Sequence, residues 1–328
     1  MRIVFVTFII YLASSEAKAW YTVRNPFQFI EPEQKVHHIT DCMDVRSDEG
    51  IFKYVKVPRF ISSPKHSKLI DVATIEDSMQ VCGLFLFTDP DKIIEIHIRH
   101  LDVDCEFGGL ISVFDGWEMN GKYFPSTQDH PLTLEQRSNE FCNDRKQYPT
   151  YRTIYRSNQN AALVQYRIPV KGSFTITVRH LKNPEPCNIL AQPDLSPSYQ
   201  LSNYGGRKNC TLSTVFPAVL DILMSNIGEQ TGKSLNYECD SESDRLVIGG
   251  TNSQKDDTND IEILTNVCGK SKERSPPMNI FCEYTTIRLI SSGKYRNEAL
   301  ITIGLPSFDD QYPLTLFCQT PGGLTDKK

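Results

Sequence analysis

The sequence has no apolar run long enough to span a bilayer. Its longest such run, Ile3 to Ala13, is about half of the roughly 20 residues that a transmembrane helix requires. The run follows a basic Met1-Arg2 start and precedes the small-residue step Ala17-Lys18-Ala19, an order typical of a secretory signal peptide. We therefore predict a signal peptide over residues 1–19, cleaved before Trp20, and a secreted, extracellular protein without membrane insertion.

A dense basic cluster is also missing. The formal net charge is −5 and the pI is about 5.8, whereas a nucleic-acid-binding surface needs a concentrated positive field. We therefore expect no nucleic acid partner. About 309 residues remain after the predicted cleavage, and single hydrophobic cores stop growing at roughly 250 to 300 residues, so the length predicts two domains.

Cysteines a few residues apart, as zinc sites and redox dithiols require, are absent. The sequence has ten cysteines, and no two are closer than 14 residues. In a secreted chain an even set like this predicts structural disulfides and no metal site. Spacing alone leaves roughly 945 possible pairings. The cysteines are Cys42, Cys82, Cys105, Cys142, Cys187, Cys210, Cys239, Cys268, Cys282 and Cys318.

Signatures of catalysis are missing as well. There is no Gly-x-Ser-x-Gly elbow, and Gly249-Gly250 lacks the pattern of a phosphate loop. His97 and His100 lie in a predicted strand, where residues three apart face opposite sides and cannot share a metal. We therefore expect a protein that is not an enzyme and needs no cofactor.

Strand patterns dominate the rest of the chain. Ile94, Ile96 and Ile98 alternate with polar residues, which predicts a half-buried strand. Similar runs are Leu84 to Phe87, Leu110 to Phe114, Ala162 to Ile168, Phe174 to Val178, Ala218 to Met224, Thr286 to Ile290 and Ile301 to Leu305. Thr133 and Gln136 form a potential capping box that predicts a short helix ending near Phe141. Many short strands broken by turn residues indicate an all-β sandwich or barrel.

Prolines concentrate near the middle, between Asn183 and Ser198. Proline stiffens the backbone and removes hydrogen-bond donors, so this stretch predicts a junction between two β units. We set the boundary near residue 185. The predicted domains are residues 20–185, including an N-terminal segment, and residues 186–320, followed by a tail over residues 321–328.

Two further patterns concern ligands and modification. Asp102, Asp104 and Asp115 flank one predicted turn region, and carboxylates converging from loops can hold Ca²⁺. This leaves an alternative function, a calcium-dependent adaptor that binds extracellular or matrix proteins. Asn209-Cys210-Thr211 is an N-glycosylation sequon, and we predict a glycan on Asn209.

Two blocks of the chain repeat one pattern: a cysteine, a few polar residues, a β run and a turn. The blocks Cys105–Gly116 and Cys239–Gly250 resemble the centre of a CUB module, so the expected fold is all-β, with two tandem CUB-like β-sandwich domains stapled by disulfides. A closer resemblance spans Cys42 to Cys318 and is to the corticotropin-releasing factor-binding protein family. Its motifs here are Val113-Phe114-Asp115-Gly116-Trp117, Phe124-Pro125-Ser126, Gln128-Asp129-His130-Pro131-Leu132, Phe141-Cys142, Pro186-Cys187-Asn188 and Ser291-Ser292-Gly293-Lys294.

The resemblance implies a function and a set of disulfides. The family binds an amphipathic helical peptide hormone and limits its access to receptors, so we expect a corticotropin-releasing-factor-like or related diuretic peptide as partner. Asp44 matches an acid implicated in ligand binding, whereas His38 stands where an arginine is expected. The stretch Ile51 to Gln80 is also longer than in the family. The implied disulfides are Cys42 with Cys82, Cys105 with Cys142, Cys187 with Cys210, Cys239 with Cys268, and Cys282 with Cys318.

Overall fold

The structure is a computed structural model that describes residues 34–57, 80–143, 154–169, 171–192, 198–228, 234–252, 261–306 and 314–318. The predicted signal peptide, the C-terminal tail and most of the long stretch before Gln80 lie outside these ranges. Within them, no helix has the length and apolar character needed to cross a bilayer.

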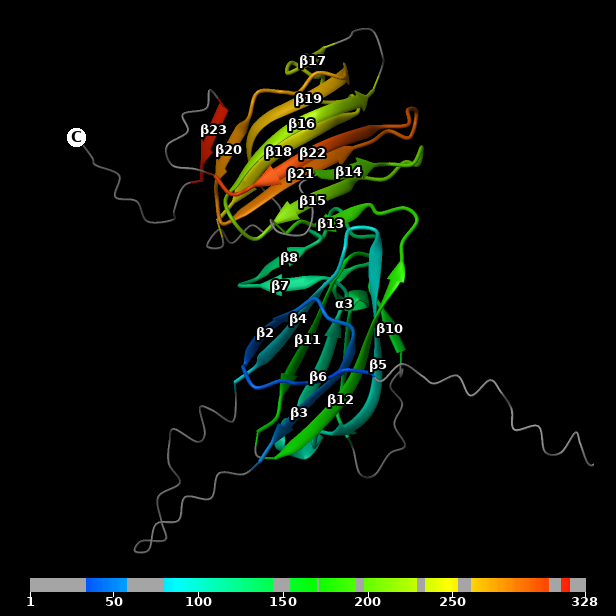
Figure 1. The fold of residues 1–328 in the computed structure, drawn as a ribbon, viewed down its shortest axis with the longest axis vertical. Helices are drawn as coiled ribbons and strands as arrows, with labels where there is room; N and C mark the ends of the chain where they lie inside the picture. The colour runs from blue at the N-terminus through cyan, green and yellow to red at the C-terminus, as the bar shows by residue number, and fades with distance from the viewer. Residues whose placement is uncertain are drawn as a thin grey trace, which may run out of the picture. The chain divides into compact units, whose positions relative to one another are not determined.

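The described strands between Val36 and Lys182 form a sandwich of two five-stranded sheets (Figure 1), here called the first sandwich. One sheet has the order β1-β3-β12-β5-β10, and the other, called the β2 sheet, has the order β2-β4-β11-β6-β9. The strands are β1 (Val36–His38), β2 (Met43–Arg46), β3 (Gly50–Lys56), β4 (Cys82–Phe87), β5 (Lys92–Asp102), β6 (Leu110–Phe114), β9 (Ser138–Phe141), β10 (Ile154–Arg156), β11 (Ala161–Arg167) and β12 (Gly172–Lys182).

Alternation along each strand gives this sandwich its core, because successive side chains of a strand point to opposite faces. Ile94, Ile96 and Ile98 of β5 are buried against residues from the other sheet, such as Leu84 and Val164. The core also contains Phe52, Ile111, Val113, Tyr166, Phe174 and Ile176. Burying each such side chain stabilises the fold by about 1.5–3 kcal/mol.

The described strands between Asn188 and Phe317 form the second sandwich, whose sheets are joined through β19. One layer runs β13-β15-β21-β18-β19, and the other contains β14, β22, β16, β20 and β23. The strands are β13 (Asn188–Leu190), β14 (Ser198–Ser202), β15 (Cys210–Thr214), β16 (Ala218–Ile227), β17 (Leu235–Asn236), β18 (Arg245–Thr251), β19 (Glu262–Ser271), β20 (Met278–Phe281), β21 (Tyr284–Ile290), β22 (Glu298–Gly304) and β23 (Leu314–Phe317). The predicted fold class, all-β with two tandem disulfide-stapled sandwiches, is confirmed.

The four remaining elements are small. β7 (Trp117–Met119) and β8 (Lys122–Phe124) form a hairpin, and η1 (Cys105–Phe107) is a single 3₁₀ turn. The helix α3 (Leu134–Arg137) has the predicted capping box, since Thr133 and Gln136 bond each other's backbone amides. It does not extend to Phe141 as predicted, because the chain turns into β9 at Ser138, where pairing with β6 replaces helical bonding.

The proline-rich stretch contains the strand β13, which pairs in parallel with β15 inside the second sandwich; that it is a domain junction stays a prediction. One other prediction needs correction. The predicted apolar alternation over Ile301 to Leu305 ends early: β22 stops at Gly304 and Leu305 is exposed. The strand's core face is carried by Ala299, Ile301 and Ile303 instead.

All ten cysteines form disulfides, in the five pairs that the resemblance implies. Four cysteines lie in the first sandwich and six belong to the second. No disulfide and no strand pairing of the described residues links the two sandwiches. Both nevertheless belong to one compact unit that begins at Val36, so the predicted boundary near residue 185 remains a prediction.

Candidate functional site

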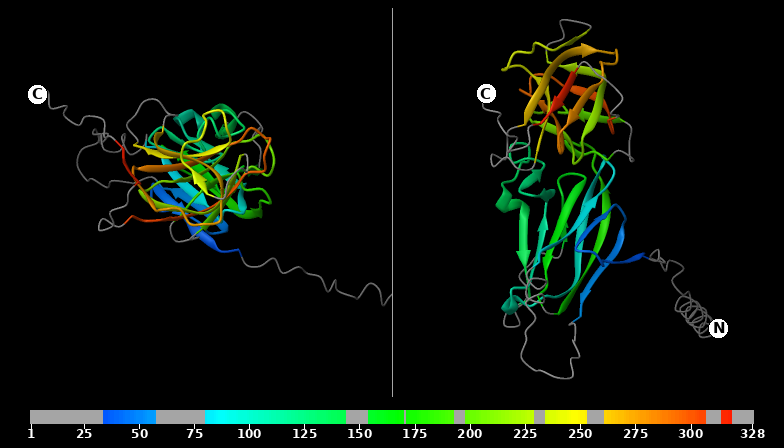
Figure 2. Two further views of the ribbon diagram at one scale, coloured as in Figure 1. Left: turned by 90° about the horizontal axis from the view of Figure 1, so that it is seen from above. Right: turned by 90° about the vertical axis from the view of Figure 1, so that its left-hand side faces the viewer.

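Asp44 and His38, the two residues predicted to bind ligand, lie on neighbouring edge strands of different sheets. His38 is exposed on β1, which pairs in parallel with β3. Asp44 is on β2, which pairs in parallel with β4. The chain crosses from one sheet to the other between them, along one edge of the first sandwich (Figure 2, β1 and β2 in blue).

Asp44 is nearly inaccessible to solvent. It is 8 % exposed and stands opposite Leu84 on the inner face of the β2 sheet. The guanidinium of Arg46, two residues on and therefore on the same face, donates from Nε to Oδ1 over 2.8 Å and from a terminal nitrogen to Oδ2 over 3.1 Å. Such a two-point ion pair fixes both side chains. The side chain of Asp44 is thus held in place, and its negative charge is compensated by Arg46.

The other face of β2 is apolar and exposed. Met43 and Val45 are 61 % and 56 % exposed, and Val81, just before β4, is also exposed. We call Met43, Val45 and Val81 the β2 edge surface. In the parallel register Val45 lies opposite Phe85, whose side chain belongs to the cluster on the outer face of the sheet. Exposed apolar groups that continue into a buried apolar cluster are typical of a docking surface.

The β7–β8 hairpin covers the adjoining part of this outer face. Trp117 packs edge-on against Phe85 and Phe87, with ring centroids 5.3 and 6.4 Å apart, and its indole N–H donates to the carbonyl of Leu86 over 2.8 Å. Leu190 of the second sandwich belongs to the same cluster. The apolar cover is therefore continuous from the hairpin into the second sandwich.

A buried polar network holds the base of the hairpin. Arg137 is 1 % exposed and donates to the backbone carbonyls of Asp115, Phe124 and Pro125 over 2.8–3.0 Å. Gly116, at φ +112°, is required there, because a Cβ would lie 2.0 Å from the carbonyl oxygen of Phe124. The Asp-Gly pair of the family motif is thus structural.

The Asp115 carboxylate accepts several hydrogen bonds in this network. Asn158 donates from its backbone N–H and from its side chain over 2.9 and 2.6 Å, and His130 lies 3.1 Å away through Nε2. The backbone N–H of Leu132 donates to Nδ1 of His130, which leaves the proton on Nε2, facing Asp115. Burial alone would raise the pKa of Asp115, but the bonds from His130 and Asn158 together lower it below its usual value. Burial also lowers the pKa of Arg137 to about 10.

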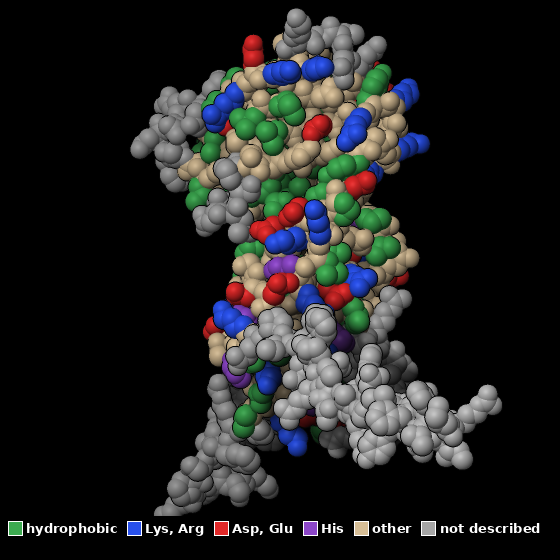
Figure 3. Space-filling view, turned by 45° about the vertical axis from the view of Figure 1, so that its right-hand side comes forward, with side chains coloured by type: hydrophobic (Ala, Val, Ile, Leu, Met, Phe, Trp, Pro, Cys, Tyr) green, Lys and Arg blue, Asp and Glu red, His purple; other side chains and the backbone are tan. Residues whose placement is uncertain are grey.

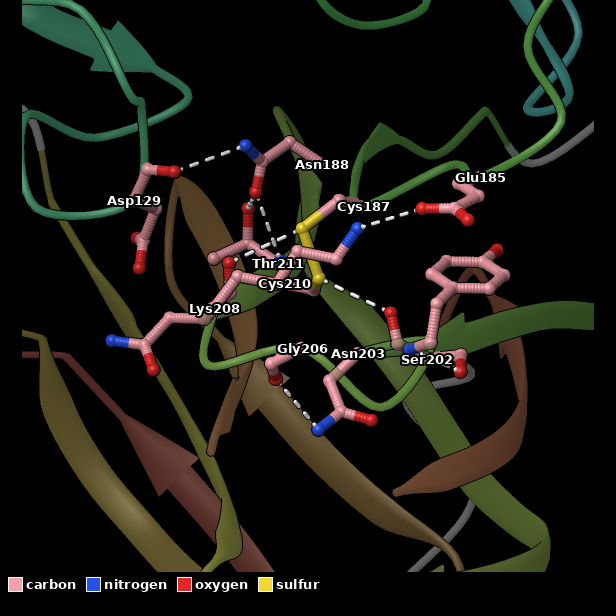
Figure 4. The surroundings of a disulfide bond; sticks show 12 residues. Asp129, Glu185, Cys187, Asn188, Ser202, Asn203, Gly206, Lys208, Cys210 and Thr211 are labelled. Carbon is pink, nitrogen blue, oxygen red and sulfur yellow. Dashed lines mark hydrogen bonds and ion pairs between the residues drawn. A yellow bond between two sulfur atoms is a disulfide. The ribbon is translucent and has the colours of Figure 1, made fainter. Parts of the chain in front are cut away.

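The Asp129 side chain, in the family motif Gln128 to Leu132, pairs with the second sandwich. Its carboxylate, with no exposed side-chain area, bonds Arg288 of β21 at 3.0 Å through Nε and 2.9 Å through a terminal nitrogen. Its backbone carbonyl accepts from Asn188, which follows Cys187 (Figure 4). Asn160 spans the same contact, donating to and accepting from the backbone of Leu190. These bonds tie the two sandwiches together.

Two cavities adjoin these elements. One, of about 490 Å³, opens between β9 and β10 at the edge opposite β1 and β2, and its mouth includes the exposed Leu132 and Ile154. The other, of about 70 Å³, lies between the hairpin and the second sandwich and is lined by Trp117, Tyr284 and Arg288, among others. On the face of the molecule in view in Figure 3, Lys and Arg side chains are interspersed with Asp and Glu, without a large surface of one sign.

The calcium alternative loses its structural basis. Asp102 and Asp104 precede β6, whereas Asp115 follows it, so the strand's five residues separate them by roughly 17 Å. Asp104 caps η1 by accepting from the N–H of Glu106. Among the described residues no group of three or more acidic, histidine or cysteine side chains is placed to hold a metal ion.

Asn209 is half-buried beside the Cys187–Cys210 disulfide. Its side-chain oxygen accepts the backbone N–H of Ser291 over 3.2 Å, and the hydroxyl of Thr211 donates to Asn188. The sequon is thus built into the fold, and a glycan on Asn209 remains a prediction.

Comparison with known proteins decides the family. The family model for the corticotropin-releasing factor binding protein N-terminal domain matches residues 71–182, and that for the C-terminal domain matches residues 193–305. The chain belongs to the corticotropin-releasing factor-binding protein family. The binding protein of Rattus norvegicus is 33 % identical over 271 residues, covering 81 % of this chain and 76 % of the relative. That of Ovis aries is 29 % identical over 279 residues, covering 84 % and 78 %.

Solved structures give a more distant likeness. The CUB1-EGF-CUB2 domains of rat MASP-1 align with 82 % of this chain and 100 % of that chain, at 11 % identity and a TM-score of 0.26. The corresponding human MASP-1/3 domains cover 69 % and 94 %, at 9 % identity and a TM-score of 0.23.

Sequence reasoning missed the residues next to its predicted site. Met43 and Val45 alternate with Asp44 and Arg46, a signal of a strand, but alternation does not say which face meets solvent. Arg288 interrupts an apolar strand between Ile287 and Leu289, which marks it as outward-facing and leaves its buried partner unknown. Asp129 has no signal of its role in the sequence apart from its place in the family motif Gln128 to Leu132.

Proposed function

We propose that this protein is secreted and sequesters a corticotropin-releasing-factor-like or related diuretic peptide hormone, limiting the peptide's access to its receptor. The observation that carries the proposal is membership of the family, whose relatives are named corticotropin-releasing factor-binding proteins. The mechanism is stoichiometric capture without turnover. Ten paired cysteines support an oxidising, extracellular setting.

We propose the β2 edge surface as part of the peptide site, with Asp44 and His38 at its border. An amphipathic helix needs an apolar strip and a few polar groups beside it. Met43 and Val45 supply apolar area worth about 1.5–3 kcal/mol each when fully buried, and the Asp44–Arg46 pair beneath holds their strand in place. Nanomolar affinity requires about −12 kcal/mol, so further contacts must contribute.

Calorimetry of the purified protein with a synthetic peptide of this hormone class tests capture. We expect one peptide per protein at submicromolar affinity. Absence of heat at micromolar concentrations rejects the function. Sequestration is tested separately by adding the protein to cells that carry the hormone's receptor, where the dose-response curve should shift in proportion to the protein added. A peptide that binds without this shift would reject sequestration alone.

Paired variants locate the site. Met43→Asp with Val45→Asp should weaken binding by at least about tenfold, since carboxylates would replace buried apolar groups. Val55→Asp is the matched control, because Val55 is equally exposed at 61 % but lies on β3 of the other sheet. His38→Arg should strengthen binding about threefold by supplying a permanent charge and a forked donor. Equal losses in the double variant and the control would exclude the β2 edge surface.

A further inference from the structure

The cavity of about 70 Å³ between the sandwiches is lined from both sides. The hairpin contributes aromatic side chains, Met119 and Lys122, and the second sandwich contributes aliphatic, hydroxyl and aromatic ones together with Arg288. This volume is about half of an engineered 150 Å³ cavity that admits benzene, so it suits the end of one aliphatic side chain. The residues that line it and carry the argument are Trp117, Met119, Tyr123, Asp129, Val215 and Tyr284.

One acceptor in this wall is unused. Asp129 Oδ2 bonds Arg288 and the hydroxyl of Ser126, but Oδ1 is buried and has no hydrogen-bond donor within the described residues. A buried carboxylate oxygen without a donor is costly, and an N–H entering the cavity would remove that cost. Because Arg288 already neutralises the carboxylate, a neutral donor fits better than a second cation.

Charged side chains of both signs surround the cavity: Lys122 and Arg288 belong to its lining, and two acids lie near it. Burial raises the pKa of Tyr284, and the carboxylates of Glu283 and Glu118 raise it further, so both acids lie near this ring. Glu283 belongs to the second sandwich and Glu118 to the hairpin. Glu118 accepts hydrogen bonds from the backbone N–H of Gly121 and from the side-chain amide of Gln165.

An apolar path joins this cavity to the β2 edge surface. Val45 stands opposite Phe85, Phe85 packs on Trp117, and Trp117 lines the cavity. A rod-like ligand lying on the edge surface and the hairpin would reach the cavity with one end. The chemistry at that end is a buried acceptor without a donor, Oδ1 of Asp129, in a wall that also contains Lys122 and Arg288.

We propose that the cavity between the sandwiches seats the N-terminal turn of the captured peptide's helix, with one aliphatic side chain inserted beside Trp117 and Tyr284. The first four N–H groups of a helix have no intrahelical partner, and the helix dipole places partial positive charge there. One of these N–H groups donates to Oδ1 of Asp129, while Glu118 and Glu283 face the positive helix end. This inference rests on the proposed function, because it assigns one end of the same peptide.

Two protein variants and two peptides test the proposal. Val215→Trp fills the cavity, and Glu283→Lys reverses the charge of one acid near it at an exposed position. Glu140→Lys is the control, because Glu140 is an exposed acid on β9 in the first sandwich. The probes are a synthetic amphipathic helical peptide of the hormone class and the same peptide shortened by its first helical turn. Thermal denaturation confirms that each variant folds.

Binding of the full peptide should weaken about tenfold in Val215→Trp and about threefold in Glu283→Lys, and change less than about twofold in Glu140→Lys. All three variants should bind the shortened peptide with the affinity of the wild type, because that peptide lacks the turn that the substitutions disturb. If Val215→Trp and Glu283→Lys bind the full peptide with wild-type affinity, or lose the same affinity for both peptides, the inference is overturned and the proposed function stands. A wild type that binds neither peptide overturns both.

Fluorescence gives an independent readout. The chain has only two tryptophans, Trp20 and Trp117, so Trp20→Phe leaves Trp117 as the reporter in the cavity wall. The full peptide should shift its emission, and the shortened peptide should not. An unchanged emission during saturating binding of the full peptide contradicts the proposal.

Discussion

The two sandwiches contain the same five-strand layer, and its edge strand meets solvent in one of them and protein in the other. The layer is β2-β4-β11-β6-β9 in the first and β13-β15-β21-β18-β19 in the second. In both layers a cysteine just before the edge strand forms a disulfide with the first residue of the strand that pairs with it, β4 or β15. This register makes Val45 equivalent to Leu190, yet Val45 is 56 % exposed and Leu190 is 1 % exposed.

The difference shows what each layer does. In the second sandwich the outer face is covered by the first, through Leu190 and the Arg288–Asp129 pair. The hairpin covers only part of the equivalent face of the first sandwich and leaves Met43 and Val45 in solvent. The layer of the second sandwich therefore packs its outer edge against the first sandwich, whereas the equivalent edge of the first sandwich stays exposed to solvent.

The polar groups differ as well. At the end of β6 the first sandwich has the buried Asp115, whereas the register places Gly250 at the equivalent end of β18. The second sandwich has an additional disulfide, Cys282–Cys318, without an equivalent among the bridges of the first. Each difference gives a prediction.

The largest effect should come from breaking the ion pair between the sandwiches. Arg288→Ala leaves the fully buried Asp129 carboxylate without its charged partner, which we expect to cost about 3–5 kcal/mol of unfolding free energy. Gln165 occupies the equivalent position of the first sandwich, and Gln165→Ala should cost about 1 kcal/mol. Denaturant unfolding measures both. Equal losses would mean that the ion pair between the sandwiches contributes no more to stability than the neutral side chain at the equivalent position.

Removing the additional disulfide should have the next largest effect. Cys282→Ala with Cys318→Ala opens a loop with a sequence separation of 36, and loop-closure entropy predicts a loss of about 3–4 kcal/mol. The unfolding midpoint of the second sandwich should fall while peptide binding to the folded protein persists. A variant as stable as wild type would show that this bridge adds nothing to a sandwich that already has two others.

The equivalent positions Leu190 and Val45 allow a direct test of the comparison. Leu190→Ala removes fully buried methyl groups and should cost about 2–5 kcal/mol. Val45→Ala should change stability by no more than about 0.5 kcal/mol, because the side chain is mostly in solvent. If Val45→Ala were as destabilising as Leu190→Ala, the edge would be part of a packed surface and unavailable to a ligand.

The smallest effect concerns acid. The folded pKa of Asp115 lies below its unfolded value, so the unfolded chain binds more protons in that window. The stability that Asp115 contributes is present above the unfolded pKa and is lost as pH falls through the folded pKa. Asp115→Asn should flatten the fall in stability below about pH 4. An unchanged acid slope would mean that other carboxylates, such as Asp244, whose pKa is also lowered, account for it.

Local patterns predicted most of the strands. β5 and β12 lie where alternating residues placed them, β6 lies where a β-rich run placed it, and the Thr133–Gln136 capping box forms as expected, because strand patterns and capping act over a few residues. The candidate site could be predicted less completely from the sequence. Asp44 was selected by resemblance, and only the structure shows that its charge is turned inward onto Arg46. The site's untested assignments remain predictions.

The sequence by itself determined the fold class, the disulfide-rich character and the family, because each depends on residue types and spacing that act locally or are directly visible. Tertiary structure alone decided which of two equivalent edge strands is covered. Met43-Asp44-Val45 and Asn188-Ile189-Leu190 both read as strands. Exposure depends on which distant elements pack against a face, here Trp117 and Asp129 from other parts of the chain, and strand alternation contains no information about them.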